Sequence, residues 1–276
     1  MIARTPHREL ERFTNLPIVD ISPLYSPDPA ARRVAARNLG AAARESGFFY
    51  VVGHGVSAAT SEKLLAQTKA FFALPLATKM RWYIGNSKSH KGYVPEGEEV
   101  FYGASRDRKE AFDLGLDLPP DDVDVQRGTP MLGPNVWPDV PGFAHDVGAY
   151  YDAASNLDSK LFHGFALALS LDETYFDPFI TKPSSQLRLI HYPFNAEAAD
   201  TQGIGAHTDY ECFTILLATG PGLEAMNGAG EWIDAPPVDG AFVVNIGDSM
   251  EIWTNGEFVA TSHRVRRVSC ARSDSC

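Results

Sequence analysis

Cysteine is scarce in this chain of 276 residues: there are three in all, Cys212, Cys270 and Cys276, and no CxxC pair. An odd count without such a pair argues against a disulfide framework and a structural zinc site, and it fits free thiols in a reducing compartment. Long apolar runs are also missing, since the stretch 47–52 is far below the roughly 20 residues that span a bilayer. No apolar segment of the signal-peptide type follows the charged first residues. We therefore expect a soluble, cytoplasmic protein without a membrane partner.

Positive charge is in short supply as well. Lys and Arg number 24 against 35 Asp and Glu, which gives a net charge of −11. A surface of this kind repels a polyanion over most of its area, so the sequence predicts no nucleic-acid partner. Apolar material, in contrast, is plentiful: 44% of the residues are hydrophobic, and 16 Phe, 10 Tyr and 4 Trp are among them. This composition predicts a sizeable core and excludes a disordered chain.

The spacing of apolar residues predicts a helical first part, residues 1–175, and a strand-rich second part, residues 176–276. Apolar residues recur at helical spacing in three segments, and short β-branched or aromatic runs bounded by Gly, Pro, Asn or Asp occur in many others. Closely spaced short strands with turns between them indicate a sandwich or small barrel, so we expect one domain, 1–276, whose second part is a jelly roll. The expected helices are 27–46, 58–72 and 143–171, and the expected strands are 16–22, 48–52, 187–192, 213–217, 232–235, 241–246 and 257–260.

A candidate metal site consists of the triplet His207-Thr208-Asp209 and a second histidine, His263. The triplet alone is a weak signal, because it arises by chance about once in a few hundred residues. Residues i and i+2 of an extended segment face the same side, so His207 and Asp209 can bind one ion together. Two imidazoles and one carboxylate that leave the other positions open are typical of non-haem Fe(II) oxygenases. Zinc is the rival ion, although the H-E-x-x-H helix of many zinc enzymes is absent. His54, in a Gly-His-Gly turn, is expected to bond to backbone instead of metal.

Further short motifs follow one another along nearly the whole chain. They are Leu16–Asp20, Gly47–Val56, Phe71–Pro75, Lys109–Asp113, Gly133–Pro138, Leu187–Pro193, Val244–Asp248, Trp253–Gly256 and Ser262–Val265. Together with the candidate metal site, the series resembles the isopenicillin N synthase-like family of Fe(II)- and 2-oxoglutarate-dependent dioxygenases, in a bacterial-type form. The resemblance implies a mainly β fold with α, namely a double-stranded β-helix (jelly-roll) core with N-terminal helices packed against it.

The resemblance also implies a set of ligands. His207, Asp209 and His263 would hold Fe(II), with 2-oxoglutarate and O2 as cosubstrates and ascorbate as a candidate reductant. Arg272 and Ser273 would bind the remote carboxylate of 2-oxoglutarate, a task suited to the planar two-donor guanidinium, and Tyr192 would help to hold the same molecule. The implied reaction is hydroxylation of a small-molecule substrate with release of succinate and CO2, in secondary metabolism such as antibiotic biosynthesis.

Two features near the end of the sequence depart from the family pattern. Asp274 stands where the pattern has a second hydroxyl, and an aspartate there would repel the carboxylate of the oxoacid. The sequence also stops four residues after Arg272, without the strand and helices that the pattern leads us to expect. The altered motif leaves open a catalytically impaired binding protein that retains the fold. The early stop leaves open an unusually open site that suits a large polar substrate, a homo-oligomer in which a partner subunit closes the site, and a reading frame truncated or shifted near the end. A desaturase or ring-forming oxidase stays open as well, because the pose of the substrate decides which bond is attacked.

Overall fold

A computed structural model describes residues 10–98, 109–193 and 202–266 of the protein. The chain divides into two compact units. The first comprises Met1–Gly55, Leu157–Phe176 and Asn195–Cys276, and the second comprises Val56–Asn156 and Asp177–Phe194. That residues 1–276 form a single domain stays a prediction.

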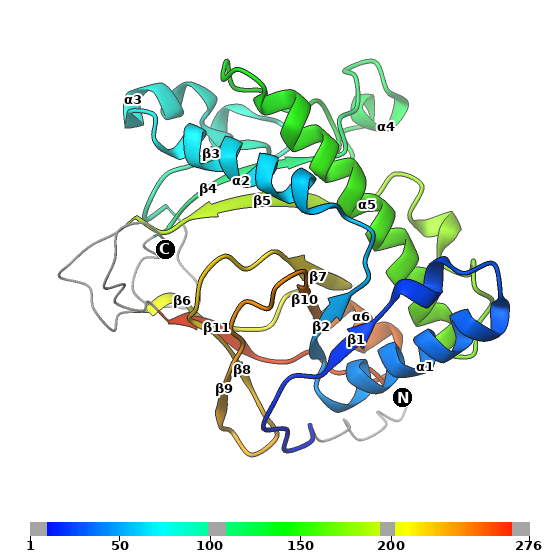
Figure 1. Ribbon diagram of the computed structural model, residues 1–276. Coiled ribbons are helices and arrows are strands. Elements are labelled where there is room, and N and C mark those ends of the chain that lie inside the picture. Colours follow the sequence, from blue (N-terminus) through cyan, green and yellow to red (C-terminus); the bar gives the residue numbers. More distant parts are fainter. Residues whose placement is uncertain (1–9, 99–108, 194–201, 267–276) are drawn as a thin grey trace, which may run out of the picture. The chain divides into compact units, whose positions relative to one another are not determined.

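The first unit contains two four-stranded sheets, which carry the jelly-roll strands (Figure 1). In one sheet the order is β1-β2-β10-β7, and in the other it is β6-β11-β8-β9. All neighbours are antiparallel except β1 and β2. The bounds are β1 (Ile18–Asp20), β2 (Phe48–Val52), β6 (Gln202–His207), β7 (Phe213–Leu216), β8 (Leu223–Met226), β9 (Trp232–Asp234), β10 (Phe242–Ile246) and β11 (His263–Arg266).

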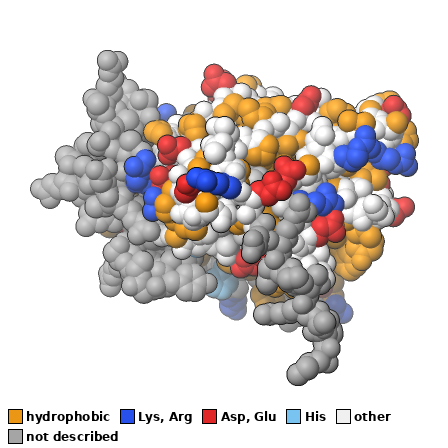
Figure 2. Space-filling model, turned by 90° about the horizontal axis from the view of Figure 1, so that it is seen from below, with side chains coloured by type: hydrophobic (Ala, Val, Ile, Leu, Met, Phe, Trp, Pro, Cys, Tyr) orange, Lys and Arg blue, Asp and Glu red, His pale blue; other side chains and the backbone are white. Residues whose placement is uncertain are grey.

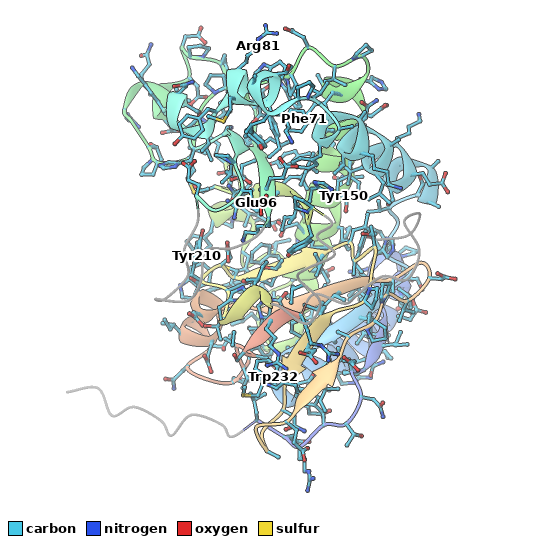
Figure 3. The ribbon with its side chains drawn as sticks, turned by 90° about the vertical axis from the view of Figure 1, so that its left-hand side faces the viewer. Phe71, Arg81, Glu96, Tyr150, Tyr210 and Trp232 are labelled. Atoms are coloured by element: carbon cyan, nitrogen blue, oxygen red, sulfur yellow. The ribbon has the colours of Figure 1, made fainter. Side chains whose placement is uncertain are left out.

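A hydrophobic core joins the two sheets of the first unit. Phe48 and Tyr50 of β2 and Val243 of β10 share one buried cluster with Leu223 and Ala225 of β8. These residues come from alternate positions of their strands, so one face of each sheet supplies the core. The opposite face of the second sheet carries polar groups: Arg264 of β11 lies over the ring of Trp232, which Figure 3 labels, at 4.0 Å from its centroid.

The helices of the first unit are α1 (Pro29–Glu45), the second half of α5 (Phe143–Ala168) and α6 (Asp248–Trp253), besides the short 3-10 helix η1 (Ser22–Tyr25). The side chain of Asp28 accepts a hydrogen bond from the amide of Ala30, and Pro29 takes the first helical position, so the start of α1 is well specified. Gly47, at φ 59°, lets the chain leave this helix and enter β2, as the sequence predicts. Helix α1 contacts both β1 and β2.

The second unit is built on a three-stranded antiparallel sheet of order β3-β4-β5. Phe71 of α2, labelled in Figure 3, contacts the rings of Phe112 on β4 at 4.8 Å and Phe143 of α5 at 5.6 Å, and these buried aromatic side chains form the core of this unit. The bounds are α2 (Ala58–Phe72), α3 (Leu76–Lys79), η2 (Met80–Trp82), η3 (Ile84–Asn86), β3 (Gly92–Val94), β4 (Glu110–Gly115), α4 (Val123–Gln126), η4 (Asp177–Phe179) and β5 (Gln186–His191).

Most of the predicted elements exist, but the balance between helix and strand differs from the prediction. The helices expected at 27–46, 58–72 and 143–171 are present as α1, α2 and α5. The fold as a whole is mixed α/β, whereas the sequence predicts a mainly β fold. The prediction of a strand at 257–260 is wrong. There the amide of Val259 donates to the carbonyl of Ala43 at the end of α1, so this buried apolar segment caps a helix and does not join a sheet. The sequence pattern also missed β6, β8, β11 and α6.

On the face drawn in Figure 2, acidic and basic side chains are interspersed with hydrophobic ones. None of the helices in the described ranges combines the length and hydropathy needed to cross a membrane.

Candidate metal centre

The two predicted histidine ligands lie opposite each other on neighbouring strands. His207 is the last residue of β6, His263 is the first residue of β11, and the two are direct partners in the antiparallel register. Their ring centroids are 4.4 Å apart. Asp209 follows two residues after β6, in the loop that leads to β7, and not within the strand itself. Strand pairing thus brings together residues far apart in the sequence.

Three potential ligand atoms converge at this point. Oδ1 of Asp209 lies 3.5 Å from Nε2 of His207 and 3.6 Å from Nε2 of His263. One donor atom from each residue lies within 4.8 Å of the others. Cis ligands of an octahedral ion, each bound at about 2.1 Å, lie about 3 Å apart, so the two distances from Oδ1 have to shorten by about 0.5 Å each for these atoms to bind one ion.

The other nitrogen of each imidazole faces a backbone carbonyl. Nδ1 of His207 lies 2.7 Å from the carbonyl oxygen of Gly205, and Nδ1 of His263 lies 3.1 Å from that of Thr261. A carbonyl oxygen can only accept, so Nδ1 of each ring carries the proton and donates it. In the neutral ring, Nε2 then holds the lone pair that a metal ion requires.

The second carboxylate oxygen of Asp209 is occupied by two donors. The hydroxyl of Thr214 on β7 donates to Oδ2 at 2.5 Å, and the side-chain amide of Asn245 on β10 donates to it at 2.8 Å. These bonds orient the carboxylate so that Oδ1 faces the two imidazoles. Neither residue was predicted, although Asn245 stands out as an amide within the apolar run 242–246.

The charge states of these groups suit a metal ligand set. Burial raises the pKa of Asp209, but the two histidines and the hydrogen bonds from Thr214 and Asn245 outweigh burial, and the pKa lies well below its usual range. Burial lowers the pKa of His263, against the opposite effect of the Asp209 charge, which favours the neutral imidazole. The site therefore offers one anionic oxygen beside the imidazole nitrogens of His207 and His263, the donor set that suits Fe(II) with open positions.

Helix α6 holds the loop that carries Asp209. The amide of Asp248 donates to the carbonyl of Asp209 at 2.7 Å, and the amide of Gly247 donates to that of Cys212 at 3.0 Å. The hydroxyl of Ser249 bonds to the carbonyl of Tyr210, whose largely exposed ring is labelled in Figure 3. The loop therefore has a defined backbone path, and the helix that defines it was not predicted.

The remaining predicted residues are placed differently. Tyr192 directly follows β5 in the second unit, partly buried, and Arg272 and Ser273 lie outside the described residues. His54 bonds to backbone, as expected, but its partner is remote in sequence: Nε2 lies 3.1 Å from the carbonyl oxygen of Gly240, and the ring packs on Phe242.

Comparisons with known proteins match both parts of the chain. Residues 16–140 match the model of the non-haem dioxygenase N-terminal region ("non-haem dioxygenase in morphine synthesis N-terminal"), and residues 183–273 match that of the 2OG-Fe(II) oxygenase superfamily. A homoarginine-6-hydroxylase of Oryza sativa subsp. japonica is 35% identical over 269 residues, which cover 92% of this chain and 81% of the relative. The clavatol oxidase of Penicillium crustosum is 34% identical over 272 residues, or 91% and 80%.

A solved structure supports the same assignment. A full-length Neurospora crassa protein in complex with alpha-KG is 25% identical and aligns with a TM-score of 0.81 over 98% of this chain and 84% of its own. The chain thus belongs to the 2OG-Fe(II) oxygenase superfamily, with the double-stranded β-helix fold of its relatives. It is a 2-oxoglutarate-dependent dioxygenase that acts on a small molecule, and His207, Asp209 and His263 are the facial triad for Fe(II). The iron and the oxoacid supply the activation of O2, while the chain binds and orients them.

Proposed function

We propose that this dioxygenase hydroxylates a small molecule in secondary metabolism and releases succinate and CO2. The observation that carries the proposal is the triad of three protein ligands, to which the described residues add no fourth carboxylate, thiolate or imidazole. Three ligands leave room for the oxoacid and for O2. The rice relative named as a homoarginine-6-hydroxylase supports hydroxylation as the outcome.

Binding of 2-oxoglutarate is assigned to Arg272, Ser273 and Tyr192. The guanidinium of Arg272 offers two parallel donors to the remote carboxylate, and hydroxyls of Ser273 and Tyr192 add further hydrogen bonds. For Arg272 and Ser273 the support is their place in the sequence, because the match to the superfamily ends with these two residues. We also propose a single domain, 1–276, with N-terminal helices packed on the jelly roll, because one solved structure aligns with 98% of the chain.

Anaerobic titration with Fe(II) followed by 2-oxoglutarate tests the proposal. The expected result is the weak visible absorption band of the iron–oxoacid chelate, and in air, succinate release that increases when the substrate is supplied from a library of small metabolites. Absence of both the band and succinate would favour the alternative of a binding protein that retains the fold.

A second candidate outcome is oxidation without oxygen insertion, such as desaturation or ring formation. The relative from Penicillium crustosum, named as an oxidase at 34% identity, favours it. The two outcomes differ in product mass, since hydroxylation adds one oxygen atom and desaturation removes two hydrogen atoms. Mass spectrometry of the product from any substrate that stimulates succinate release separates them.

A further inference from the structure

Three residues form a row across the first sheet of the first unit. Asn245 on the central strand β10 pairs with Phe48 on β2 at one side and with Thr214 on β7 at the other. Residues directly opposite each other on neighbouring strands project to the same face of a sheet. The row therefore presents an aromatic ring, an amide and a hydroxyl side by side.

Every member of this row contacts a metal ligand. Thr214 and Asn245 donate to Oδ2 of Asp209 at 2.5 and 2.8 Å, and the ring of Phe48 packs against that of His263 at 5.4 Å between centroids. Phe48 and Asn245 are buried, with exposures of 0% and 2%. A buried amide is costly unless it is hydrogen-bonded, so the bond from Asn245 to Asp209 is firmly held.

We propose that the row Phe48–Asn245–Thr214 is the positioning platform of the metal site, and that Asn245 and Thr214 restrict Asp209 to one metal-binding oxygen, Oδ1. A carboxylate that chelates an ion uses lone pairs of both oxygens, and the two donors already engage those of Oδ2. One-oxygen ligation keeps a coordination position open. The inference concerns the metal site and holds whichever reaction the enzyme catalyses.

Two volume-conserving variants test the platform. Thr214→Val removes the hydroxyl donor, and Asn245→Leu removes the amide donor. Co(II) serves as the probe, in the absence of 2-oxoglutarate and substrate, because its visible absorption reports on coordination number. We expect each variant to bind Co(II) about 10- to 100-fold more weakly, the usual effect of losing a hydrogen bond to a metal ligand. We also expect a changed absorption intensity, because Oδ2 becomes able to bind the ion.

Matched controls separate positioning from general damage. Thr214→Ser keeps the hydroxyl and should retain the Co(II) affinity and spectrum of the parent protein. Thr68→Val removes a hydroxyl that bonds the carbonyl of Leu64 within α2, and it should leave both unchanged. Folding is checked by near-ultraviolet circular dichroism, and if Asn245→Leu fails to fold, Thr214→Val decides alone. Parent-like Co(II) affinity and spectrum in folded Thr214→Val overturn the proposal, without any bearing on hydroxylation.

Discussion

Each residue of the facial triad uses one atom for the metal and another for the protein. Nδ1 of His207 and Nδ1 of His263 bond to backbone carbonyls, and Oδ2 of Asp209 bonds to Thr214 and Asn245. Side chains anchored in this way lose little freedom on binding an ion, which is how a protein preorganises a site.

Removal of a triad ligand should abolish binding of the iron. We expect His207→Ala and Asp209→Ala to bind no Fe(II) at protein concentrations where the parent chain binds one equivalent, because two remaining ligands do not hold a labile ion. His145→Ala is the matched control, since this histidine side chain is 81% exposed and Nδ1 lies 2.9 Å from a carboxylate oxygen of Asp146. Anaerobic titration with a colorimetric iron assay measures the stoichiometry, and full occupancy in either triad variant would contradict the ligand set.

If 2-oxoglutarate binds at the proposed site, two variants should change its dissociation constant in opposite directions. Arg272→Lys keeps the charge but loses the planar pair of donors, so the dissociation constant for 2-oxoglutarate should rise about 10-fold. Asp274→Ser replaces a negative charge with the hydroxyl that the family pattern has at this position, so the dissociation constant should fall. Titration of the visible chelate band under anaerobic conditions measures both. An unchanged constant in Arg272→Lys would assign the remote carboxylate to another cation.

At the scale of elements, the second unit is held together by a buried ion pair between its helices and its sheet. Nζ of Lys79 at the end of α3 lies 2.6 Å from Oε2 of Glu110 at the start of β4, and both side chains are at most 8% exposed. Tyr93 on β3 donates to the same oxygen, and Nδ1 of His191 on β5 lies 2.9 Å from Oε1. Burial raises the pKa of Glu110, but these partners outweigh it and lower the pKa to about 2.

Glu110→Ala should destabilise the protein by about 3–5 kcal/mol, because it leaves the Lys79 ammonium buried without a counter-ion. The lowered pKa adds a pH dependence: the contribution of Glu110 is complete above its ordinary pKa of 4.5 and is lost as the pH falls toward about 2. Urea unfolding at pH 7 measures the first effect. Asp139→Ala breaks the pair with Arg81, in which both side chains are largely exposed, and serves as control, with an expected change below about 1 kcal/mol. An equal loss of unfolding free energy in the two variants would show that burial of the Lys79–Glu110 pair does not matter for stability.

Helix α5 carries a carboxyl group with the opposite behaviour. Burial raises the pKa of Asp158 from 3.8 to about 7. The fold therefore disfavours the ionised form, and this cost is absent below pH 3.8, grows as the pH rises and is complete above about pH 7. Asp158→Asn should raise stability by up to about 4 kcal/mol at pH 8, and by up to about 2 kcal/mol at pH 5. Thermal unfolding at the two pH values measures the change in stability, and Asp152→Asn, at an exposed position, serves as control. A larger increase in stability at pH 5 than at pH 8 would contradict a raised pKa of Asp158.

At the scale of the whole molecule, the metal should stabilise the fold, because its ligands come together only when β6 and β11 pair. An ion that binds only the folded chain adds about 2.7 kcal/mol at a concentration of 100 times its dissociation constant. For a chain of this size that corresponds to a rise in Tm of about 5–10 °C. Differential scanning calorimetry with Co(II), and its reversal by a chelator, checks this value. Asp209→Ala should show no rise, and a rise of equal size in that variant would place the stabilising ion elsewhere.

Much of the molecule could be predicted because its signals are local. Helix α2 was expected at 58–72 and is Ala58–Phe72, since apolar spacing and capping depend on near neighbours. The segment 257–260 was expected to be a strand, because an apolar run shows that a segment is buried but not what it pairs with. β6 was missed because its glycine-containing sequence, Gln202–His207, has a weak strand signal, and only pairing with β11 makes it a strand.

The sequence by itself determined the chemistry of the site. Two histidines and an aspartate within a series of family motifs specify the donor atoms, hence the ion and its cosubstrate, because coordination depends on the identity of the side chains. Only the tertiary structure decided how these atoms meet. The antiparallel register places His207 opposite His263, and the row from Phe48 to Thr214 orients His263 and Asp209. Such placement rests on hydrogen bonds between strands distant in sequence, whose partners no local pattern encodes.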